Sequence, residues 1–227
     1  MCWNADISIN TFIFGLLSLI FIYFTNTFTK YKTKEFDNPF MYVIIFSFVI
    51  MQLLEYFIWK NFKNKEMNTN LSIIGFIILM IQPITIMLYD SYDNGNIINL
   101  AKNILLYTLA WISFLLYKYF YNPISFITTI GKNGHLAWNW LYFNKYELIA
   151  YILLYFSYIL YSFLYIPNRL SNIYKYVFVI TLFISRILYY NTTEFGSMWC
   201  WVINIYLLIL LVNILLLKPF YEYNGLC

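Results

Sequence analysis

The sequence predicts an all-α fold, a polytopic transmembrane helical bundle with seven spans, formed by one domain over 1–227 with its N-terminus outside. Three observations predict it. Of the 227 residues, 62% are hydrophobic and only 11% are charged, and seven separate stretches are long and apolar enough to cross a bilayer. Soluble globular chains carry about 25% charged residues and about 45–50% apolar ones. The composition therefore indicates an integral, multi-pass membrane protein whose main partner is the lipid bilayer.

The same composition excludes other classes. Three cysteines in a chain of 227 residues cannot form the framework of a secreted disulfide scaffold. The 14 Lys and Arg residues are scattered among 10 Asp and Glu residues, so no nucleic-acid partner is indicated. A retinal-binding photoreceptor is disfavoured, because its Schiff base needs a lysine in the middle of the last span and this chain has only Lys218 at the very end. No cofactor is indicated.

The seven spans follow from the need for about 20 mostly apolar residues to cross ~30 Å of hydrocarbon. The second span is broken only by Glu55, and the third only by Gln82-Pro83. The sixth span is short and contains Arg186. The predicted spans are approximately 7–29, 40–59, 71–89, 97–117, 148–166, 176–190 and 195–217.

The connection between the fourth and fifth spans is unusually long and contains two apolar runs, 124–130 and 135–143. The segment Gly131-Lys-Asn-Gly134 separates them. The second run is too short to span a bilayer. We therefore expect an interfacial or re-entrant element over 135–143 whose aromatic residues lie at headgroup depth, namely Trp138, Trp140 and Tyr142.

The orientation follows from the first span. No Lys or Arg precedes it, whereas the next connection carries Lys30, Lys32 and Lys34, and basic residues favour the cytoplasmic side. Two N-x-[ST] sequons, at Asn70 and Asn191, would then share the outer face. Basic residues over the whole chain are balanced between the two sides, so the N-out prediction depends on the first span alone.

Glu55 is the clearest ionisable residue within a span, and Gln52 lies one turn earlier on the same helical face. A charge at bilayer depth costs about 2.5–3.5 kcal/mol on insertion scales, so it normally faces protein or water and has a partner. Three interpretations stay open. Glu55 could be paired with Arg186 or capped by Trp59 for packing only, it could belong to a functional pocket, or it could be a near-surface residue without a specific role.

Other polar residues in the spans also have both a structural and a functional interpretation. Glu194, Ser197, Trp201 and Asn204 are spaced to share one helical face, which is more often an interhelical contact than a pore lining. Pro83 has no N–H to donate, so it leaves a backbone carbonyl oxygen without its helical partner. Gln82 could form a binding site with that oxygen or merely donate a hydrogen bond to it.

His135 is the only histidine, and one imidazole cannot build a three-histidine zinc centre. In the N-out orientation it falls in the outer half of the protein with other reactive side chains, which suggests a pocket there. Two carboxylates and an imidazole could bind a metal ion or pass protons. Cys2 and Cys200 could form a disulfide or remain reduced. The outer group comprises Cys2, Asp6, Glu55, His135, Arg186, Glu194 and Cys200.

Four short motifs carry a resemblance: Met1-Cys2-Trp3-Asn4, Gln82-Pro83, His135-Leu-Ala-Trp138, and Met198-Trp199-Cys200 preceded by Glu194. Together they resemble an uncharacterised family of multi-span membrane proteins found in bacteria and large DNA viruses, which would place a viral member in a host or virion membrane. The family has no established activity to carry over. The resemblance implies that the positions to test first are Cys2, Trp3, Glu55, Gln82, His135, Trp138, Glu194, Trp199 and Cys200.

The leading functional prediction is an outer-side polar pocket that binds or moves a small solute, a proton or a metal ion. Glu55 would be the charged acceptor, His135 a gate or relay, and Glu194 the second carboxylate. One alternative is an intramembrane enzyme that uses the same cluster, and another is a structural or receptor-like membrane protein of a virus. The predicted pocket residues are Glu55, Gln82, His135, Trp138, Glu194, Cys2, Cys200 and Arg186.

Overall fold

A computed structural model describes most of the chain. The described residues are 4–95, 97–121, 126–141, 144, 146–147, 149–151, 153–155, 180–181, 183–185, 187–188, 193–194, 196–197 and 201–225. They are mostly helical, and they include one two-stranded sheet.

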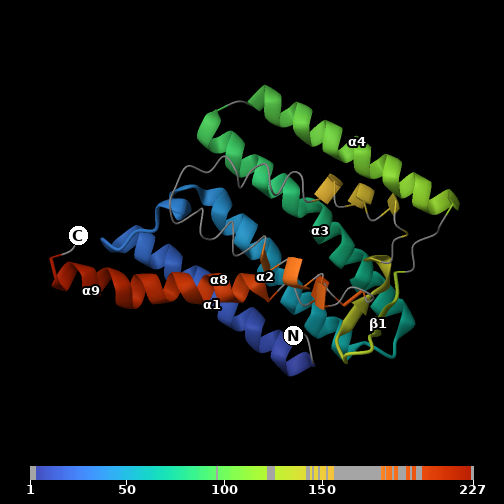
Figure 1. Cartoon of the computed structure of the whole chain (residues 1–227), viewed down its shortest axis with the longest axis horizontal. Helices are drawn as coiled ribbons and strands as arrows, with labels where there is room; N and C mark the ends of the chain where they lie inside the picture. The colour runs from blue at the N-terminus through green and yellow to red at the C-terminus, as the bar shows by residue number, and fades with distance from the viewer. Residues whose placement is uncertain are drawn as a thin grey trace.

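Four antiparallel helices lie side by side in chain order and form one layer (Figure 1). The connections between them are short, which favours antiparallel packing of sequence neighbours. α2 packs against both α1 and α3, and α3 packs against α4. The layer consists of α1 (Ala5–Phe28), α2 (Pro39–Lys60), α3 (Lys65–Asn94) and α4 (Ile97–Tyr121).

Asparagine side chains begin three of these helices. The side chains of Asn4, Asn38 and Asn64 accept hydrogen bonds from backbone N–H groups in the first turns of α1, α2 and α3. Such caps satisfy N–H groups that have no partner within the helix. Gly95, at φ 65°, ends α3 in the left-handed conformation that glycine adopts without strain. Local polar residues therefore set helix ends that hydropathy alone leaves vague.

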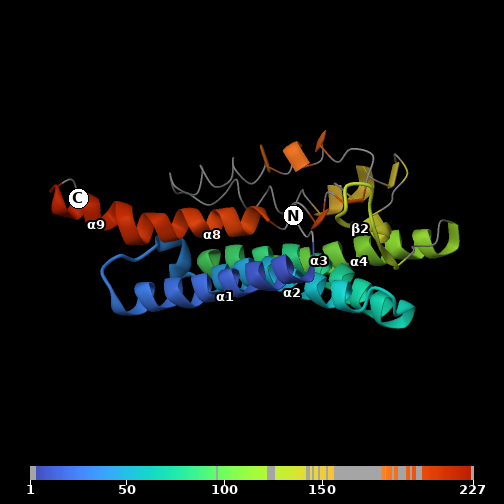
Figure 2. The ribbon, with the colours of Figure 1, turned by 90° about the horizontal axis from the view of Figure 1, so that it is seen from below.

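A further helix lies over one face of this layer (Figure 2). α8 (Val202–Val212) continues through the π-helical η3 (Asn213–Leu217) into α9 (Lys218–Tyr223), and α8 packs against α1 and α2. Pro219 has no N–H to donate within the helix, which accounts for the wider π turn directly before α9.

The end of α9 is joined to the connection between α1 and α2. Glu222 forms an ion pair with Lys30 and accepts a hydrogen bond from the Tyr31 hydroxyl at 2.8 Å. Lys218 Nζ donates to the carbonyl oxygen of Lys32 at 2.6 Å. The C-terminal ends of α1 and α9 therefore lie at the same end of the molecule.

Among the described residues, five helices are long and apolar enough to cross a membrane, which is consistent with an integral membrane protein. They correspond to the first four predicted spans and the last one. The fifth and sixth predicted spans, 148–166 and 176–190, lie largely outside the described residues, although the described residues between 149 and 155 and between 180 and 188 are helical. The five helices are Ala5–Phe28, Pro39–Lys60, Lys65–Tyr89, Ile97–Tyr121 and Val202–Tyr223.

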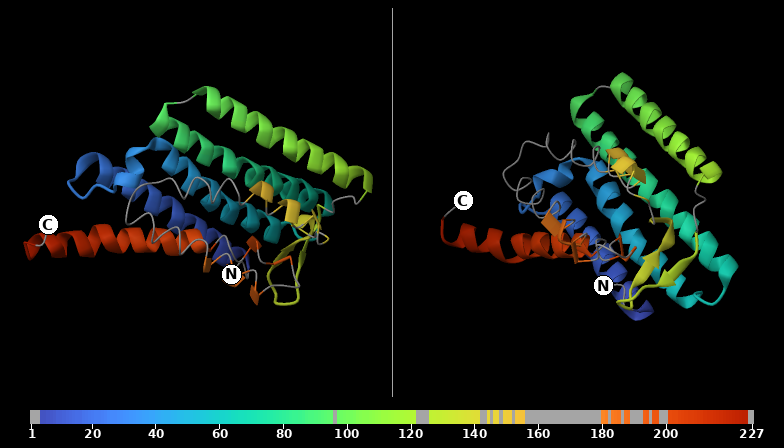
Figure 3. Two further views of the ribbon diagram at one scale, coloured as in Figure 1. Left: turned by 45° about the horizontal axis from the view of Figure 1, so that its top comes forward. Right: turned by 45° about the vertical axis from the view of Figure 1, so that its right-hand side comes forward.

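A β-hairpin follows α4 and packs where α2 ends and α3 begins (Figure 3). β1 (Thr128–Ile130) pairs antiparallel with β2 (Leu136–Trp138), and the short 3-10 helix η2 (Asn139–Leu141) follows. Gly134 in the connecting turn has φ 78°, which glycine adopts without strain.

This hairpin, with η2, contains most of the segment that the sequence predicts to be interfacial or re-entrant. Leu136, Trp138 and Trp140 are at most 1% exposed, so both tryptophans pack against protein, while Tyr142 lies outside the described residues. The Gly131-Lys-Asn-Gly134 turn lets the two apolar runs pair with each other, which satisfies their backbone polar groups and frees their side chains for burial.

The hairpin is anchored to α3 by one asparagine. Asn68 Nδ2 donates to the carbonyl oxygen of Thr128, and the Thr128 N–H donates to Asn68 Oδ1, both at 2.9 Å. The hydroxyl groups of Ser72 and Thr128 are 2.7 Å apart. Asn68 is 2% exposed and supplies the backbone partners that a neighbouring strand would otherwise supply.

Aromatic side chains complete the contact between hairpin and helices. The ring of Phe76 on α3 meets Trp111 of α4 edge-on at 5.9 Å and Trp140 at 5.3 Å between centroids. The ring centroids of Trp138 and Trp140 are 5.0 Å apart. Aromatic pairs in such arrangements contribute about 0.5–1.5 kcal/mol each beyond their buried area. The hairpin is therefore held by both polar and aromatic contacts.

We expect Asn68→Ala to destabilise the protein by about 2–3 kcal/mol, because it leaves two buried backbone groups of Thr128 without partners. Thermal unfolding of the purified protein in detergent measures the loss. Asn70→Ala, at an exposed position on the same helix, is the matched control and should change stability little. Equal losses in the two variants would show that Asn68 is not an anchor.

Candidate functional site at the hairpin end

Glu194 is completely buried against the hairpin turn. The Asn133 N–H donates to Glu194 Oε1 at 3.1 Å, and Asn133 Nδ2 donates to Glu194 Oε2 at 2.7 Å. The Trp138 N–H also donates to the carbonyl oxygen of Thr193 at 3.3 Å. These hydrogen bonds offset part of the cost of burying a carboxylate. They join the hairpin to the segment that leads into α8.

Gly131 makes room for this carboxylate. A Cβ atom at Gly131 would lie 1.6 Å from Glu194 Oε1 and 2.3 Å from Glu194 Cδ, distances that no side chain can accept. We call Gly131 and Asn133 the Glu194 socket, since one provides the space and the other the hydrogen bonds. Glycine is thus required at position 131, because any side chain there would overlap the Glu194 carboxylate.

His135 lies in the same turn, and its imidazole interacts electrostatically with Glu194. The side chain is 4% exposed, and its carbonyl oxygen accepts a hydrogen bond from the Gly131 N–H at 2.8 Å. Burial lowers the pKa of His135 below its ordinary value of 6.5, while the negative charge of Glu194 acts in the opposite direction. The imidazole is therefore neutral near pH 7.

Glu55 lies on the buried face of α2 and is 0% exposed, as is Gln52 one turn earlier. Thr11 Oγ1 donates to Gln52 Oε1 at 2.9 Å, and this contact sets the register between α1 and α2. Because the two helices are antiparallel, Ser8 lies at the same height as Glu55, one turn nearer the hairpin end. Ser8 is also 0% exposed.

Asn204, on the first turn of α8, faces α1 near the middle of that helix. A Cβ atom at Gly15 would lie 3.5 Å from Asn204 Oδ1 and 2.8 Å from Val49 Cγ2, so three helices meet here. Asn204 is 6% exposed, and among the described residues neither polar atom of its side chain has a hydrogen-bond partner. We call the residues between α1, α2 and α8 the polar seam: Ser8, Thr11, Gln52, Glu55 and Asn204.

Gln82 has a different role, because it links three helical segments. Gln82 Nε2 donates to the Ser47 carbonyl oxygen of α2 at 3.1 Å, and the Tyr155 hydroxyl donates to Gln82 Oε1. Gln82 and Tyr155 are at most 1% exposed. Gln82 therefore acts as an interhelical hydrogen-bonding residue in this structure.

The structure brings three predicted pocket residues together at the hairpin: His135, Trp138 and Glu194. Trp138 also packs near Leu54, because a Cβ at Gly75 would lie 2.8 Å from Leu54 Cδ2 and 3.4 Å from Trp138 Cζ3. The hairpin is thus at the height of the α2 turn that carries Glu55. Cys2, Arg186 and Cys200 lie outside the described residues.

The polar residues from Glu194 to Asn204, which the sequence places on one helical face, are not all part of one helix in the structure. Glu194 lies in a turn, and α8 begins only at Val202. The hydrogen bonds of the socket orient its carboxylate toward the hairpin, whereas Asn204 faces α1. Four polar residues at helical spacing therefore do not form one continuous helical face.

Sequence reasoning missed a buried ion pair at the same end. Lys118 Nζ lies 2.9 Å from Glu147 Oε2, and both side chains are at most 3% exposed. The Asn144 N–H donates to Glu147 Oε2, while Asn144 Oδ1 accepts from the Glu147 N–H. This reciprocal pair is a capping box, whose signal is a polar residue followed three positions later by a glutamate.

Comparison with family models, with curated proteins and with solved structures finds no match to this chain. Among the described residues, no group of three or more His, Cys, Asp or Glu side chains is arranged to hold a metal ion. The Glu194 socket and the polar seam are the buried polar arrangements from which a function can be inferred.

We expect Gly131→Ala to displace the Glu194 carboxylate and to destabilise the protein by about 3 kcal/mol, the upper end for overpacking in a buried site. The change is measured as a loss of thermal stability in detergent. Lys132→Ala, at the next and exposed position of the turn, should leave stability nearly unchanged. If Gly131→Ala is as stable as Lys132→Ala, the socket does not hold Glu194.

We expect stability to fall as the pH drops below about 6.5, and His135→Gln to weaken this dependence. The pKa of His135 is lowered in the folded protein, so the unfolded chain binds the proton more tightly. This contribution is fully present above the ordinary pKa and is lost progressively as the pH falls below it. Melting temperatures between pH 5 and 8, compared for the two proteins, measure the difference. Parallel curves would contradict the role of His135.

Proposed function

We propose that this chain is a seven-span, N-out membrane protein that binds and moves a small solute, in the first instance a proton, through its hairpin end. The observation that carries the proposal is the polar seam, which extends from Glu55 near the hairpin to Asn204 at the middle of α1. It runs between helices that are long and apolar enough to span a membrane. Ionisable residues inside membrane helices are rare, and they mark proton and ion paths in pumps and transporters.

The residues have separate roles in this proposal. His135 takes up and releases protons below pH 6.5, because burial lowers its pKa, and the adjacent Glu194 partly offsets this by stabilising the imidazolium form. Glu55 accepts the proton within the seam. The pair Thr11 and Gln52 then provides hydrogen-bonding groups between Glu55 and Asn204.

The direction of the helices supports an odd number of spans. Gly15 meets Asn204, and Lys30 pairs with Glu222, so α1 and the helix from α8 to α9 run in the same direction. α4 ends at the hairpin end, where the segment before α8 begins. These directions favour an even number of spans between α4 and α8, and the helical residues near 149–155 and 180–188 are consistent with two.

The membership of this chain in the uncharacterised multi-span family of bacteria and large DNA viruses belongs to the same proposal. Its support is that three of the shared motifs contain residues with specific contacts. Glu194 occupies the socket, Trp138 packs near Gly75, and Gln82 links three helical segments.

Proton flux into liposomes tests the function. The full chain is reconstituted with a pH-sensitive dye inside, and a potassium diffusion potential is imposed. We expect Glu55→Gln to lower the flux at least tenfold, because the neutral amide cannot take up a proton. Glu66→Gln is the matched control, since Glu66 is exposed at the start of α3.

A second set of variants separates the parts of the path. His135→Ala should shift the pH at which flux is half-maximal, and Asn204→Leu should reduce flux without changing that pH. Flux that is equal in the wild-type protein and Glu55→Gln would overturn the proposal.

A structural role is the second candidate, and a specific observation favours it. Glu194 and Gln82 are both held by hydrogen bonds to neighbouring segments, as expected for polar residues that only fix helix packing. In that case no solute flux is found in any variant, while Glu194→Gln and Gln82→Leu lower thermal stability.

A further inference from the structure

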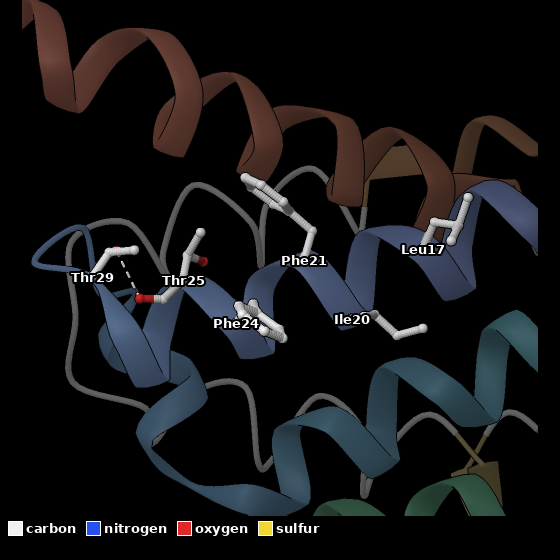
Figure 4. A pocket seen from close by; sticks show the side chains of 6 residues that line it. All are labelled: Leu17, Ile20, Phe21, Phe24, Thr25 and Thr29. Carbon is white, nitrogen blue, oxygen red and sulfur yellow. Dashed lines mark hydrogen bonds between the residues drawn. The ribbon is translucent and has the colours of Figure 1, made fainter.

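An apolar groove runs along the outer face of α1 (Figure 4). It has a volume of about 370 Å³. Three of its side chains are more than half exposed: Leu17 at 59%, Ile20 at 51% and Phe24 at 58%. Its lining consists of Leu17, Ile20, Phe21, Phe24, Thr25 and Thr29.

The two threonines do not make the groove polar. Thr25 Oγ1 donates to the Ile22 carbonyl oxygen at 2.9 Å, and Thr29 Oγ1 donates to the Thr25 carbonyl oxygen at 2.8 Å. Both hydroxyl groups are thus satisfied within the helix. An occupant of the groove would meet hydrocarbon surface, which favours a hydrocarbon chain.

The length of the groove matches one leaflet of a bilayer. From Leu17 to Thr29 the helical rise of 1.5 Å per residue gives about 18 Å. Half of a hydrocarbon core about 30 Å thick is about 15 Å. One acyl chain of a lipid in the leaflet nearest Thr29 would therefore extend along the groove.

Basic residues follow the groove at that end. Lys30, Lys32 and Lys34 come directly after Thr29, and all three are exposed. Lys30 is paired with Glu222, and the exposed Asp37 lies beyond Lys34. Because α1 ends at Phe28, Lys32 and Lys34 follow the end of the apolar helix, the position at which basic side chains attract anionic lipid headgroups.

We propose that the groove on α1 binds an acyl chain of an anionic phospholipid whose phosphate lies beside Lys32 and Lys34. The apolar lining selects the chain, and the lysines select the charge of the headgroup. This lipid site does not depend on the proposed movement of a solute, because it lies on the outer face of α1 and shares no residue with the polar seam.

Native mass spectrometry of the full chain in mild detergent tests the proposal. The protein is offered an equimolar mixture of phosphatidylglycerol and phosphatidylcholine. We expect one retained lipid per chain, with phosphatidylglycerol preferred about 25-fold. Lys32→Gln combined with Lys34→Gln should abolish the preference, since each basic residue near the surface contributes about fivefold in affinity. Equal retention of both lipids by the wild-type protein would overturn the proposal.

Two further variants complete the test. Lys102→Gln is the control for charge, because Lys102 is exposed near the start of α4, away from the groove, and it should keep the wild-type preference. Ile20→Trp fills the groove at an exposed position and should remove both lipids without lowering thermal stability. Leu17→Trp, also at an exposed position, repeats the filling from the other end. Wild-type lipid retention by both filled variants would also contradict the site.

Discussion

The contact between Glu194 and the hairpin turn determines much of the arrangement at this end of the protein. A carboxylate with no exposed surface is costly, and the two hydrogen bonds from Asn133 offset that cost only if the turn stays in place. The same contact positions the segment before α8, and with it Asn204. It also sets a negative charge beside His135. Packing, charge and the course of the chain are thus coupled through one side chain.

Glycine permits the closest approaches in the described part of the chain. Gly15 admits the methyl groups of Val49, Gly75 admits Leu54 and Trp138, and Gly131 admits Glu194. Lipid tails are as apolar as leucine, so helices in a bilayer associate through close packing and hydrogen bonds more than through the hydrophobic effect. Gly15 and Gly75 are placed where such contacts between helices are made.

Much of the helical layer could be predicted, whereas the contacts between its elements could not. The apolar stretches from α1 to α4 are long, and charged or capping residues bound them, so hydropathy locates them well. Glu55 could be nominated because ionisable residues are rare within spans, and Glu194 because it directly precedes the last apolar stretch at helical spacing to Ser197. The strand pairing of the hairpin could not be predicted from its short aromatic runs alone, although the Gly131-Lys-Asn-Gly134 turn is a signal for it. The contact of Thr11 with Gln52 has no sequence signal, since apolar helices can slide past one another without changing their hydropathy.

The ion pair of Lys118 and Glu147 has a consequence for biosynthesis. The ammonium group at the end of α4 is made before its carboxylate partner, which lies 29 residues later in the chain. Until Glu147 has been synthesised, Lys118 must remain hydrated at the membrane surface, because a lone charge is costly in hydrocarbon. The final depth of α4 is therefore reached only together with the helical residues that follow Glu147. Insertion of these two elements becomes one cooperative event, and a chain halted between them would leave α4 incompletely seated.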